Sequence, residues 1–367
     1  MINRPAPNRF DGVLFAIVMS IITLGLLNLY SITGGSKVFF QQIFWIVSGG
    51  AIAAVVASVD YRKFDQTAWL WYGAGVLALV LVLVLGNNIR GSTRWLSFGG
   101  VALQPSEPIK VFLVIALAHY LNHDPRVGGR TLVDLIAPTI ILLIPMGLIL
   151  LQPDLGTALI CALIFLTIMV LTQLRRCSLI KLVVAAAIGA PLVWFYGLHA
   201  YQKERVVAFY KRLTGDTTHL LDSGWHTHQS LVAIGSGGWF GKGFGKGTQN
   251  RFDFLPDRHT DFPFPVWAEE HGFVGAVLVL FLYAALVLWS LRIAYRAKDR
   301  FGAVLAVGVG AMIFWQAGVN LAMVSGLAPV VGMTLPLFSY GGSSVLTVMF
   351  GLGLLMSVSM RRFSHGD

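Results

Sequence analysis

Ten stretches of this 367-residue chain are apolar over about the length of a membrane span. A hydrocarbon layer roughly 30 Å thick takes about 20 helical residues to cross. Since a helix satisfies its own backbone polar groups in lipid, the pattern predicts an all-α integral membrane protein with ten transmembrane helices. The predicted spans are 12–32, 38–58, 67–86, 106–121, 132–151, 155–173, 179–198, 272–291, 302–323 and 344–359.

The charged residues are few and unevenly placed. Only 12% of residues are charged and 56% are hydrophobic, which excludes a soluble enzyme and a disordered chain. With the N-terminus inside, the inner segments hold fifteen Lys and Arg, and the short outer loops hold Lys37, Arg90 and Arg94. Lys and Arg concentrate on the cytoplasmic side of membrane proteins. We therefore expect both termini in the cytoplasm and interpret the net charge of +10 as loop charge, with no nucleic-acid partner.

One connection, residues 199–264 on the outer side, is much longer than the others. Long loops in compact bundles are usually functional or disordered, and the aromatic content of this one argues against disorder. Residues 201–212 mix apolar and basic side chains in the pattern of an amphipathic helix lying in the membrane interface. We predict a single polytopic membrane domain, residues 1–367, with this large outer loop between the seventh and eighth spans as a candidate functional segment.

Charged groups at membrane depth are costly and are functional-site candidates by default. Glu107 and Lys110 are three residues apart and share a helix face, so they can pair, and Ser106 is able to cap that helix. The sequence leaves two roles open for Glu107 and Lys110, a structural ion pair and a catalytic pair. Asp154 in Gln152-Pro153-Asp154-Leu155-Gly156-Thr157 either caps the sixth helix or lines the same cavity.

The glycine-rich stretch 235–247 lacks the spacing of a nucleotide-binding loop. Its Lys242 and Lys246 could still approach a phosphate, but a turn-rich loop with solvated lysines is the simpler reading. His226 and His228 form a His-x-His pair without a third fixed ligand, so no metal ligand is assigned.

The densest polar cluster spans residues 255–272 and includes Asp261, Glu269 and Glu270. A carboxylate partly removed from water gains proton affinity, as a general base near neutral pH requires. Alternatively, Asp261 caps a short helix beginning near Pro263 or pairs with Arg258. The outer loop 325–344 is too apolar to be solvated, so we expect it to fold back into the bundle and line a groove.

Taken in order, these motifs resemble the SEDS family (shape, elongation, division and sporulation), and within it the RodA branch more than the FtsW branch. The chain departs from the family pattern at Pro108, Pro263 and Pro265, and Asp257 stands where Glu is usual. The matching motifs are Arg94-Trp95-Leu96, Gln104-Pro105-Ser106-Glu107 with Lys110, Gln152–Thr157, Gly247-Thr248-Gln249, Leu255-Pro256, His259-Thr260-Asp261-Phe262, Glu269-Glu270 and Ser339-Tyr340-Gly341-Gly342-Ser343.

The resemblance implies a peptidoglycan glycosyltransferase that polymerises lipid II at the outer face of the bacterial inner membrane, for cell-wall elongation and rod shape. It also implies a class B penicillin-binding protein as partner. Asp261 matches the aspartate that the family requires, and we expect it to be the general base of an inverting transfer. Mg²⁺ or Mn²⁺ is expected to assist, since the departing diphosphate needs charge stabilisation. Candidate substrate and pyrophosphate contacts are Arg94, Lys110, Lys242, Lys246, His259, Ser339 and Tyr340, and Glu107, Asp154, Glu269 and Glu270 are expected to shape the cavity.

Two other classes of function compete with this one. A lipid II flippase or proton-coupled carrier needs alternating access, and the sequence contains no inverted repeat. A scaffold that only anchors a transpeptidase would leave the carboxylates in the spans unexplained. An activity assay on Asp261→Asn separates the three.

Overall fold

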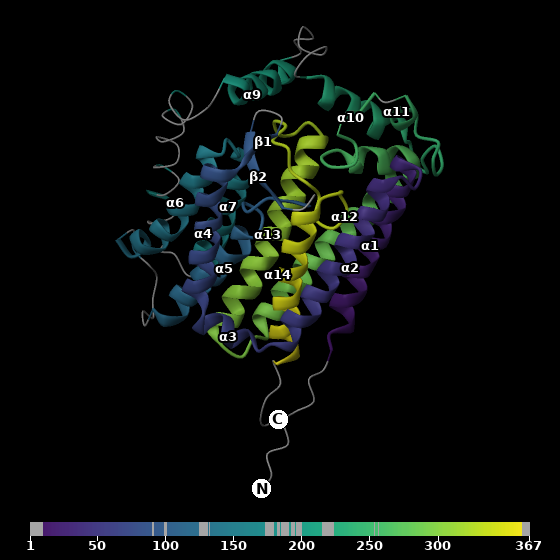
Figure 1. Ribbon diagram of the computed structural model, residues 1–367. Coiled ribbons are helices and arrows are strands. Elements are labelled where there is room, and N and C mark those ends of the chain that lie inside the picture. Colours follow the sequence, from purple (N-terminus) through teal and green to yellow (C-terminus); the bar gives the residue numbers. More distant parts are fainter. Residues whose placement is uncertain are drawn as a thin grey trace.

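The computed structural model describes residues 10–89, 92–98, 101–124, 131, 133–172, 200–214, 224–252, 254, 255 and 257–361, and isolated positions between 180 and 195. They form a bundle of long helices, with short elements gathered at one end (Figure 1). We call the end that carries α9, α10 and α11 the upper end. The end where α1 begins and α14 ends is the lower end.

Nine apolar helices fall within the described residues. Seven are long and apolar enough to cross a membrane by themselves, and α5 and α7 are shorter. Eight of the predicted spans match the observed bounds within four residues, whereas the predicted span 179–198 lies outside the described residues. The nine helices are α1 (Gly12–Thr33), α2 (Lys37–Ser58), α4 (Ala68–Leu85), α5 (Ile109–His123), α6 (Ile136–Leu151), α7 (Leu155–Leu171), α12 (Pro263–Tyr295), α13 (Arg300–Val324) and α14 (Gly342–Met360).

The prediction of an all-α chain is wrong in one place. Strands β1 (Asn87–Ile89), β2 (Ser92–Phe98) and β3 (Val101–Leu103) form a small antiparallel sheet in the order β1-β2-β3. It fills the connection between α4 and α5. Strands this short give almost no periodic signal in a sequence.

The eighth predicted helix, 272–291, is also different: α12 begins at Pro263, nine residues earlier. Gly272 interrupts it with φ 66° and ψ −161°, so a short buried segment precedes the long span. A Cβ at position 272 would lie 2.4 Å from the nitrogen of Gly241 and 2.6 Å from the carbonyl oxygen of Trp239. Only glycine fits this break.

The glycine-rich stretch closes the break in α12. The amides of Lys242 and Gly243 donate to the carbonyls of Glu269 and Glu270, at 2.9 and 3.0 Å. On the other side of the break, the amide of Phe273 donates to the carbonyl of Gly238 at 2.8 Å. The backbone groups that a broken helix leaves unpaired therefore find partners in this loop. Its glycines serve the fold, which is the simpler of the two readings of this stretch.

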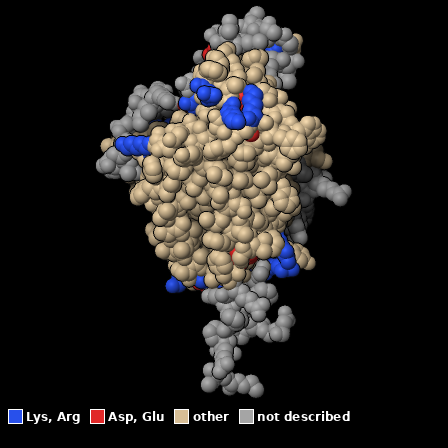
Figure 2. All heavy atoms as spheres, turned by 90° about the vertical axis from the view of Figure 1, so that its right-hand side faces the viewer, with Lys and Arg blue, Asp and Glu red and all other residues tan. Residues whose placement is uncertain are grey.

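Helices α5, α13 and α14 lie in the middle of the bundle (Figure 1). On the face shown in Figure 2, charged side chains gather near the two ends, and the band between them is free of them. Exposed apolar side chains such as Phe44, Leu70 and Phe281 cover the outside of the helices. This is the surface of a protein that spans a membrane.

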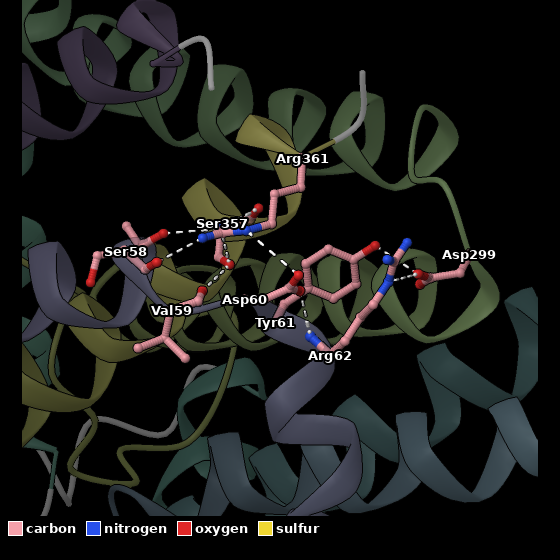
Figure 3. A network of polar contacts seen from close by, with 9 residues as sticks. Ser58, Val59, Asp60, Tyr61, Arg62, Asp299, Ser357 and Arg361 are labelled. Atoms are coloured by element: carbon pink, nitrogen blue, oxygen red, sulfur yellow. Dashed lines mark hydrogen bonds and ion pairs between the residues drawn. The ribbon is translucent and has the colours of Figure 1, made fainter. Parts of the chain in front are cut away.

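A network of polar contacts holds the helix ends together at the lower end (Figure 3). The Arg361 guanidinium, after α14, donates to the carbonyls of Ala57 and Ser58 at the end of α2, at 3.0 and 2.7 Å. Asp299, before α13, accepts from the hydroxyl of Tyr61 and from Arg62 of α3 (Tyr61–Gln66), at 2.7 and 3.1 Å. Burial acts to raise the pKa of Asp299, but the hydrogen bonds and the Arg62 charge lower it below its usual value.

The remaining elements are short. At the upper end lie α9 (Ala200–Leu213), α10 (Trp225–Ser236) and α11 (Thr248–Arg251). Helix α9 covers the whole of the predicted amphipathic segment, and its Tyr210 is exposed whereas Ala208 is buried. A 3₁₀ turn (Val133–Leu135) leads into α6.

Candidate active site

Asp261 lies in a turn at the upper end, directly before α12. The amides of Thr260 and Asp261 both donate to the carbonyl of Asp257, at 3.1 and 3.0 Å. Pro263 then occupies the first turn of the helix, where a missing amide hydrogen costs nothing. The N-cap residue of α12 is Phe262, whose side chain makes no capping hydrogen bond. Asp261 is therefore not the N-cap residue, and the alternative that it pairs with Arg258 stays a prediction.

The carboxylate of Asp261 faces the loop that the sequence predicted to fold back. A Cβ on Gly332 would lie 3.4 Å from Asp261 Oδ2. The amide nitrogen of Asn320 donates to the carbonyl of Asp261 at 2.9 Å and to that of Met333 at 2.5 Å. Asn320 thus ties the Asp261 turn to the loop, and the Asp261 residue itself is half-buried.

The folded-back loop, residues 326–341, is confirmed as part of the bundle. Met333, Leu335, Leu337 and Phe338 are all buried. Ser339, a predicted substrate contact, is 3% exposed, and its hydroxyl accepts from the Leu335 amide at 2.8 Å. In this structure Ser339 shapes the loop and does not face solvent.

His259 and Tyr340, two further predicted contacts, lie beside each other. Their ring centroids are 5.9 Å apart, and the Tyr340 amide donates to the His259 carbonyl at 2.8 Å. The Tyr340 hydroxyl donates to the side chain of Gln41 in α2 at 3.0 Å. Burial raises the pKa of Tyr340, so the phenol stays protonated near neutral pH. Both side chains remain partly accessible next to the Asp261 turn.

Glu269 and Glu270 are almost without exposure, and each has a specific partner. Lys242 Nζ lies 2.7 Å from Glu269 Oε1, and the amide and hydroxyl of Thr248 both donate to the same oxygen at 2.8 Å. Glu270 accepts from the hydroxyl of Ser31 in α1 at 2.5 and 2.7 Å. These contacts tie the start of α12 to the glycine-rich stretch and to α1, and the expected role of both carboxylates in shaping the cavity stays a prediction. Lys242 is bound to Glu269, whereas Lys246 is exposed.

A second group of charged residues, the Asp154 cluster, lies where β2, α5 and α7 meet. Asp154 caps α7 by accepting from the Thr157 amide at 3.2 Å, and it also accepts from Gln104 and Ser106, at 3.0 and 3.3 Å. The first sequence reading of Asp154, a cap of the following helix, is therefore confirmed, and its role in lining a cavity stays a prediction. Ser106 does not cap α5, which begins at Ile109 with Pro108 at the cap position.

The basic residues of the Asp154 cluster are engaged within the protein. Lys110 has no exposed surface and pairs with Glu107 at 2.9 Å, as the spacing predicted. Arg94 donates to the carbonyls of Gln152 and Pro153, and its guanidinium is 3.9 Å from Asp154. Lys110 was predicted to contact pyrophosphate, and full burial against Glu107 opposes this: here it compensates a buried carboxylate.

The folded-back loop joins the two groups. Gln104 of the Asp154 cluster donates its amide to the Ser343 hydroxyl at 2.9 Å, at the start of α14. A Cβ on Gly156 in α7 would lie 2.7 Å from the sulfur of Met333 in the loop. The loop thus contacts Asp261 at Gly332 and His259 at its own Tyr340, and it contacts α7 beside Asp154 at Met333.

Several residues that hold the site together were not predicted. Asn320 in α13 and Gln42 in α2 are buried amides inside apolar helices. Gln42 donates to the Ser339 carbonyl at 3.0 Å and accepts from the Gly341 amide at 3.2 Å. A polar side chain within a membrane span costs free energy, so it marks a candidate functional position. That signal was present in the sequence and could have identified both residues.

A shallow hollow opens between α9, α10 and the folded-back loop. Arg205 of α9 lines it and donates to the Val330 carbonyl at 2.9 Å, and Thr227 and Pro329 form part of its wall. Nearby, His226 stacks on Phe262 with ring centroids 5.9 Å apart. Burial lowers the pKa of His226, so its ring is neutral near pH 7.

A bundle of apolar helices with buried ionic groups at one end defines a multi-pass membrane protein with a polar site near one membrane surface. Residues 11–363 match the FtsW/RodA/SpoVE family, described as cell cycle proteins. The chain belongs to this family, which confirms the predicted SEDS membership.

Named relatives match over nearly the full chain. The peptidoglycan glycosyltransferase MrdB of Escherichia coli K12 is 37% identical over 96% of this chain and 94% of its own length. A probable peptidoglycan glycosyltransferase FtsW of Trichlorobacter lovleyi is 33% identical over 96% of this chain and 93% of its own.

Solved structures share the fold. One, described as "Structural coordination of polymerization and crosslinking by a peptidoglycan synthase complex", has a TM-score of 0.83 at 33% identity and covers 96% of this chain and 98% of its own. The Thermus thermophilus rod shape determining protein RodA has a TM-score of 0.72 at 32% identity, covering 97% of this chain and 98% of its own.

Proposed function

We propose that this protein is a peptidoglycan glycosyltransferase that polymerises lipid II, with Asp261 as its general base. One observation carries the proposal: Asp261 is a half-buried carboxylate, fixed by its own turn and by Asn320 beside a folded-back loop at the end of the bundle. The names of the relatives supply the reaction class. A carboxylate held in one place and still reachable is what a general base needs.

The proposed reaction is an inverting displacement. The 4-hydroxyl of the acceptor sugar attacks the anomeric carbon of the donor chain, while Asp261 takes the hydroxyl proton. The bond from that carbon to the undecaprenyl diphosphate oxygen breaks. The diphosphate leaves as an anion, so no second carboxylic acid is required. His259 and Tyr340, beside the Asp261 turn, are proposed to contact the sugars.

The leaving diphosphate needs positive charge. Of the predicted cationic contacts, Lys246 is exposed, whereas Lys242 is paired to Glu269 and Lys110 is buried against Glu107. We therefore assign Lys246 as the first contact to the diphosphate. Arg94 holds the strand–helix junction at Gln152 and is a weaker candidate.

A divalent cation, Mg²⁺ or Mn²⁺, fits the site only if it arrives with the substrate. Among the described residues, the group of three metal-binding side chains that lie close enough together is at the lower end, away from Asp261. Mg²⁺ is typically held by one or two carboxylates together with substrate phosphates. The diphosphate would supply ligands to the cation, since Asp261 needs its carboxylate to take the acceptor proton, and the cation would neutralise phosphate charge.

We further propose ten spans, with both termini in the cytoplasm and the upper end in the periplasm. Helices α1 and α14 meet at the lower end, where Ser359 donates to Asp11 at 2.6 Å. Helix α7 runs from the Asp154 cluster toward the lower end, and α9 lies at the upper end. Because α7 ends toward the lower end and α9 lies at the upper end, their placement supports the tenth predicted span, 179–198. The inner-membrane location follows from the lipid II substrate.

A class B penicillin-binding protein is the proposed partner. The structural relative described as a peptidoglycan synthase complex couples polymerization and crosslinking. Helices α2 and α4 expose apolar side chains, and these form a lateral surface on which the partner could bind within the membrane. The partner would crosslink the strands that this protein polymerises.

The test uses purified protein together with a partner that has no polymerase activity of its own. Labelled lipid II and Mn²⁺ are added in detergent. Asp261→Asn is expected to lower glycan-ladder formation by about 10²- to 10⁴-fold, the usual contribution of a general base. Glu204→Gln, an exposed carboxylate on α9, is the matched control and should keep full activity.

Folding of each variant is checked by thermal denaturation in the same detergent. Ladders that persist in Asp261→Asn would contradict the assignment of the base. If no condition yields ladders while lipid II crosses vesicle bilayers containing the protein, it is a flippase and the proposed enzyme function fails.

A further inference from the structure

Three metal-binding side chains converge at the lower end, at the opposite end of the bundle from Asp261. Asp65 lies in the last turn of α3, and His119 and His123 are one turn apart on α5. His119 Nδ1 is 2.8 Å from Asp65 Oδ1, and His123 Nδ1 is 3.9 Å from the same oxygen. One ligand atom from each residue lies within 4.8 Å of the others. The sequence analysis singled out none of the three.

Neighbouring side chains hold this Asp65–His119–His123 cluster in place. Asn122 donates to Asp65 Oδ2 at 3.1 Å, which fixes the orientation of the carboxylate. Trp69 of α4 packs edge-on against the His119 ring, with centroids 5.7 Å apart. Such outer contacts orient ligands in established metal sites.

The cluster is also accessible. The side chains of Asp65 and His119 are about one-fifth exposed and that of His123 is 60% exposed. The two histidines border a hollow together with Trp69, Tyr120 and Asp124. An ion could therefore enter from solvent and keep a water molecule as a further ligand.

We propose that Asp65, His119 and His123 bind a first-row divalent transition-metal ion, with Zn²⁺ the best fit. Two imidazoles and one carboxylate favour Zn²⁺ over Mg²⁺ or Ca²⁺, which prefer oxygen ligands alone. Histidines four residues apart on one helix face are a recurrent zinc-binding pair. Three protein ligands leave the fourth position to water.

The distances agree with this assignment. A tetrahedral ion with ligands at about 2.0 Å needs ligand atoms about 3.3 Å apart. The separations of the two histidine Nδ1 atoms from Asp65 Oδ1, 2.8 and 3.9 Å, lie on either side of that value. His123 Nδ1 also lies 3.0 Å from the His119 carbonyl, so the exposed His123 ring would leave this contact to bind the ion. The ion would replace the proton shared by His119 and Asp65 and link α3 to α5, a structural or regulatory role separate from sugar transfer.

The test measures zinc binding to tag-free, chelator-stripped protein in detergent, without lipid II, by calorimetry and elemental analysis. We expect one equivalent of Zn²⁺ and a rise in the Tm on adding it. His123→Gln should weaken binding at least about tenfold and abolish the Tm shift. Because His123 is mostly exposed, this variant should fold. Asp65→Asn should weaken binding in the same way.

His228→Gln in α10 is the matched control, since it removes a histidine elsewhere and should bind Zn²⁺ as the wild type does. Co²⁺ in place of Zn²⁺ should give the visible absorption of a tetrahedral site, lost in His123→Gln. The proposal is overturned if wild-type protein shows no saturable binding, or if His123→Gln binds as tightly as the wild type. Loss of binding in His228→Gln alone would place the ion elsewhere and equally overturn it.

Discussion

Gly332 of the folded-back loop lies beside the Asp261 carboxylate, and its backbone conformation requires glycine. Its φ is +70°, a conformation that costs other residues about 1–2 kcal/mol, while an added Cβ would make ordinary van der Waals contact with Asp261 Oδ2 at 3.4 Å. We predict that Gly332→Ala lowers glycan-ladder formation about 10- to 100-fold, because relief of the strained φ shifts the loop backbone that lies against the base. The measurement is lipid II turnover beside the thermal unfolding curve.

Gly318→Ala is the matched control for this substitution, because nothing lies within 4 Å of its added Cβ and its φ is helical. It should leave both activity and Tm unchanged. Unaltered turnover in Gly332→Ala would show that the substrate does not approach Asp261 along this side.

Lys242 and Lys246 were predicted to have the same role, and the structure separates them. Lys242→Gln leaves the buried Glu269 carboxylate without its counter-charge, so it should destabilise the fold by about 3 kcal/mol. Lys246→Gln changes an exposed residue and should alter stability by less than about 0.5 kcal/mol, while raising the KM for lipid II several-fold. Chemical denaturation and steady-state kinetics distinguish the two, and an equal loss of stability in both would contradict this division.

How far the site was predictable varies among these residues. The pairing of Glu107 with Lys110 followed from helix spacing alone, whereas the role of Asp261 rests on its family motif and stays a prediction. The partners of Glu269 and Glu270 did not, because Lys242 and Ser31 are far from them in sequence and meet them only after folding. Sequence spacing reports contacts within an element, whereas contacts between elements depend on packing.

The break in α12 at Gly272 sets the position of the short helical segment that follows Asp261. Gly272→Ala would force a Cβ into the backbone of Trp239 and Gly241, so we predict loss of the folded protein or a drop in Tm of more than about 10 °C. Gly235→Ala, in α10, meets nothing within 4 Å and should raise or preserve the Tm. Fluorescence-detected size exclusion after heating measures both, and a stable Gly272→Ala protein would contradict the role given to the break.

Apolar runs were a reliable guide to helices, and their interruptions were not. The run of apolar residues predicted the long part of α12 after Gly272. The short buried segment before it was missed, because it contains Pro263, Pro265 and two glutamates. Prolines in a first helical turn are compatible with a helix. The rest of the protein buries this segment, so its sequence lacks the continuous apolar run of a membrane span. The β1–β3 sheet was missed because its strands are three to seven residues long.

The membrane-spanning helices place the upper and lower ends of the bundle on opposite sides of the membrane. Helices α9–α11 lie at the upper end, and α3, which carries Asp65, lies at the lower end (Figure 1). A band of apolar surface separates the ends (Figure 2). The proposed lipid-linked donor would therefore reach Asp261 from the upper leaflet.

The orientation of the bundle is testable by labelling single cysteines in cells. Cys161 is buried, so replacing Cys177 by Ser provides a silent background. We predict that Lys246→Cys, at the upper end, reacts with a membrane-impermeant maleimide in spheroplasts. Lys63→Cys, in α3 at the lower end, should react only after the inner membrane is disrupted. Both residues are exposed, so a difference between them reflects the membrane and not burial. Labelling of Lys63→Cys in intact spheroplasts would invert the topology, put Asp261 in the cytoplasm, and remove the basis for polymerisation at the outer face.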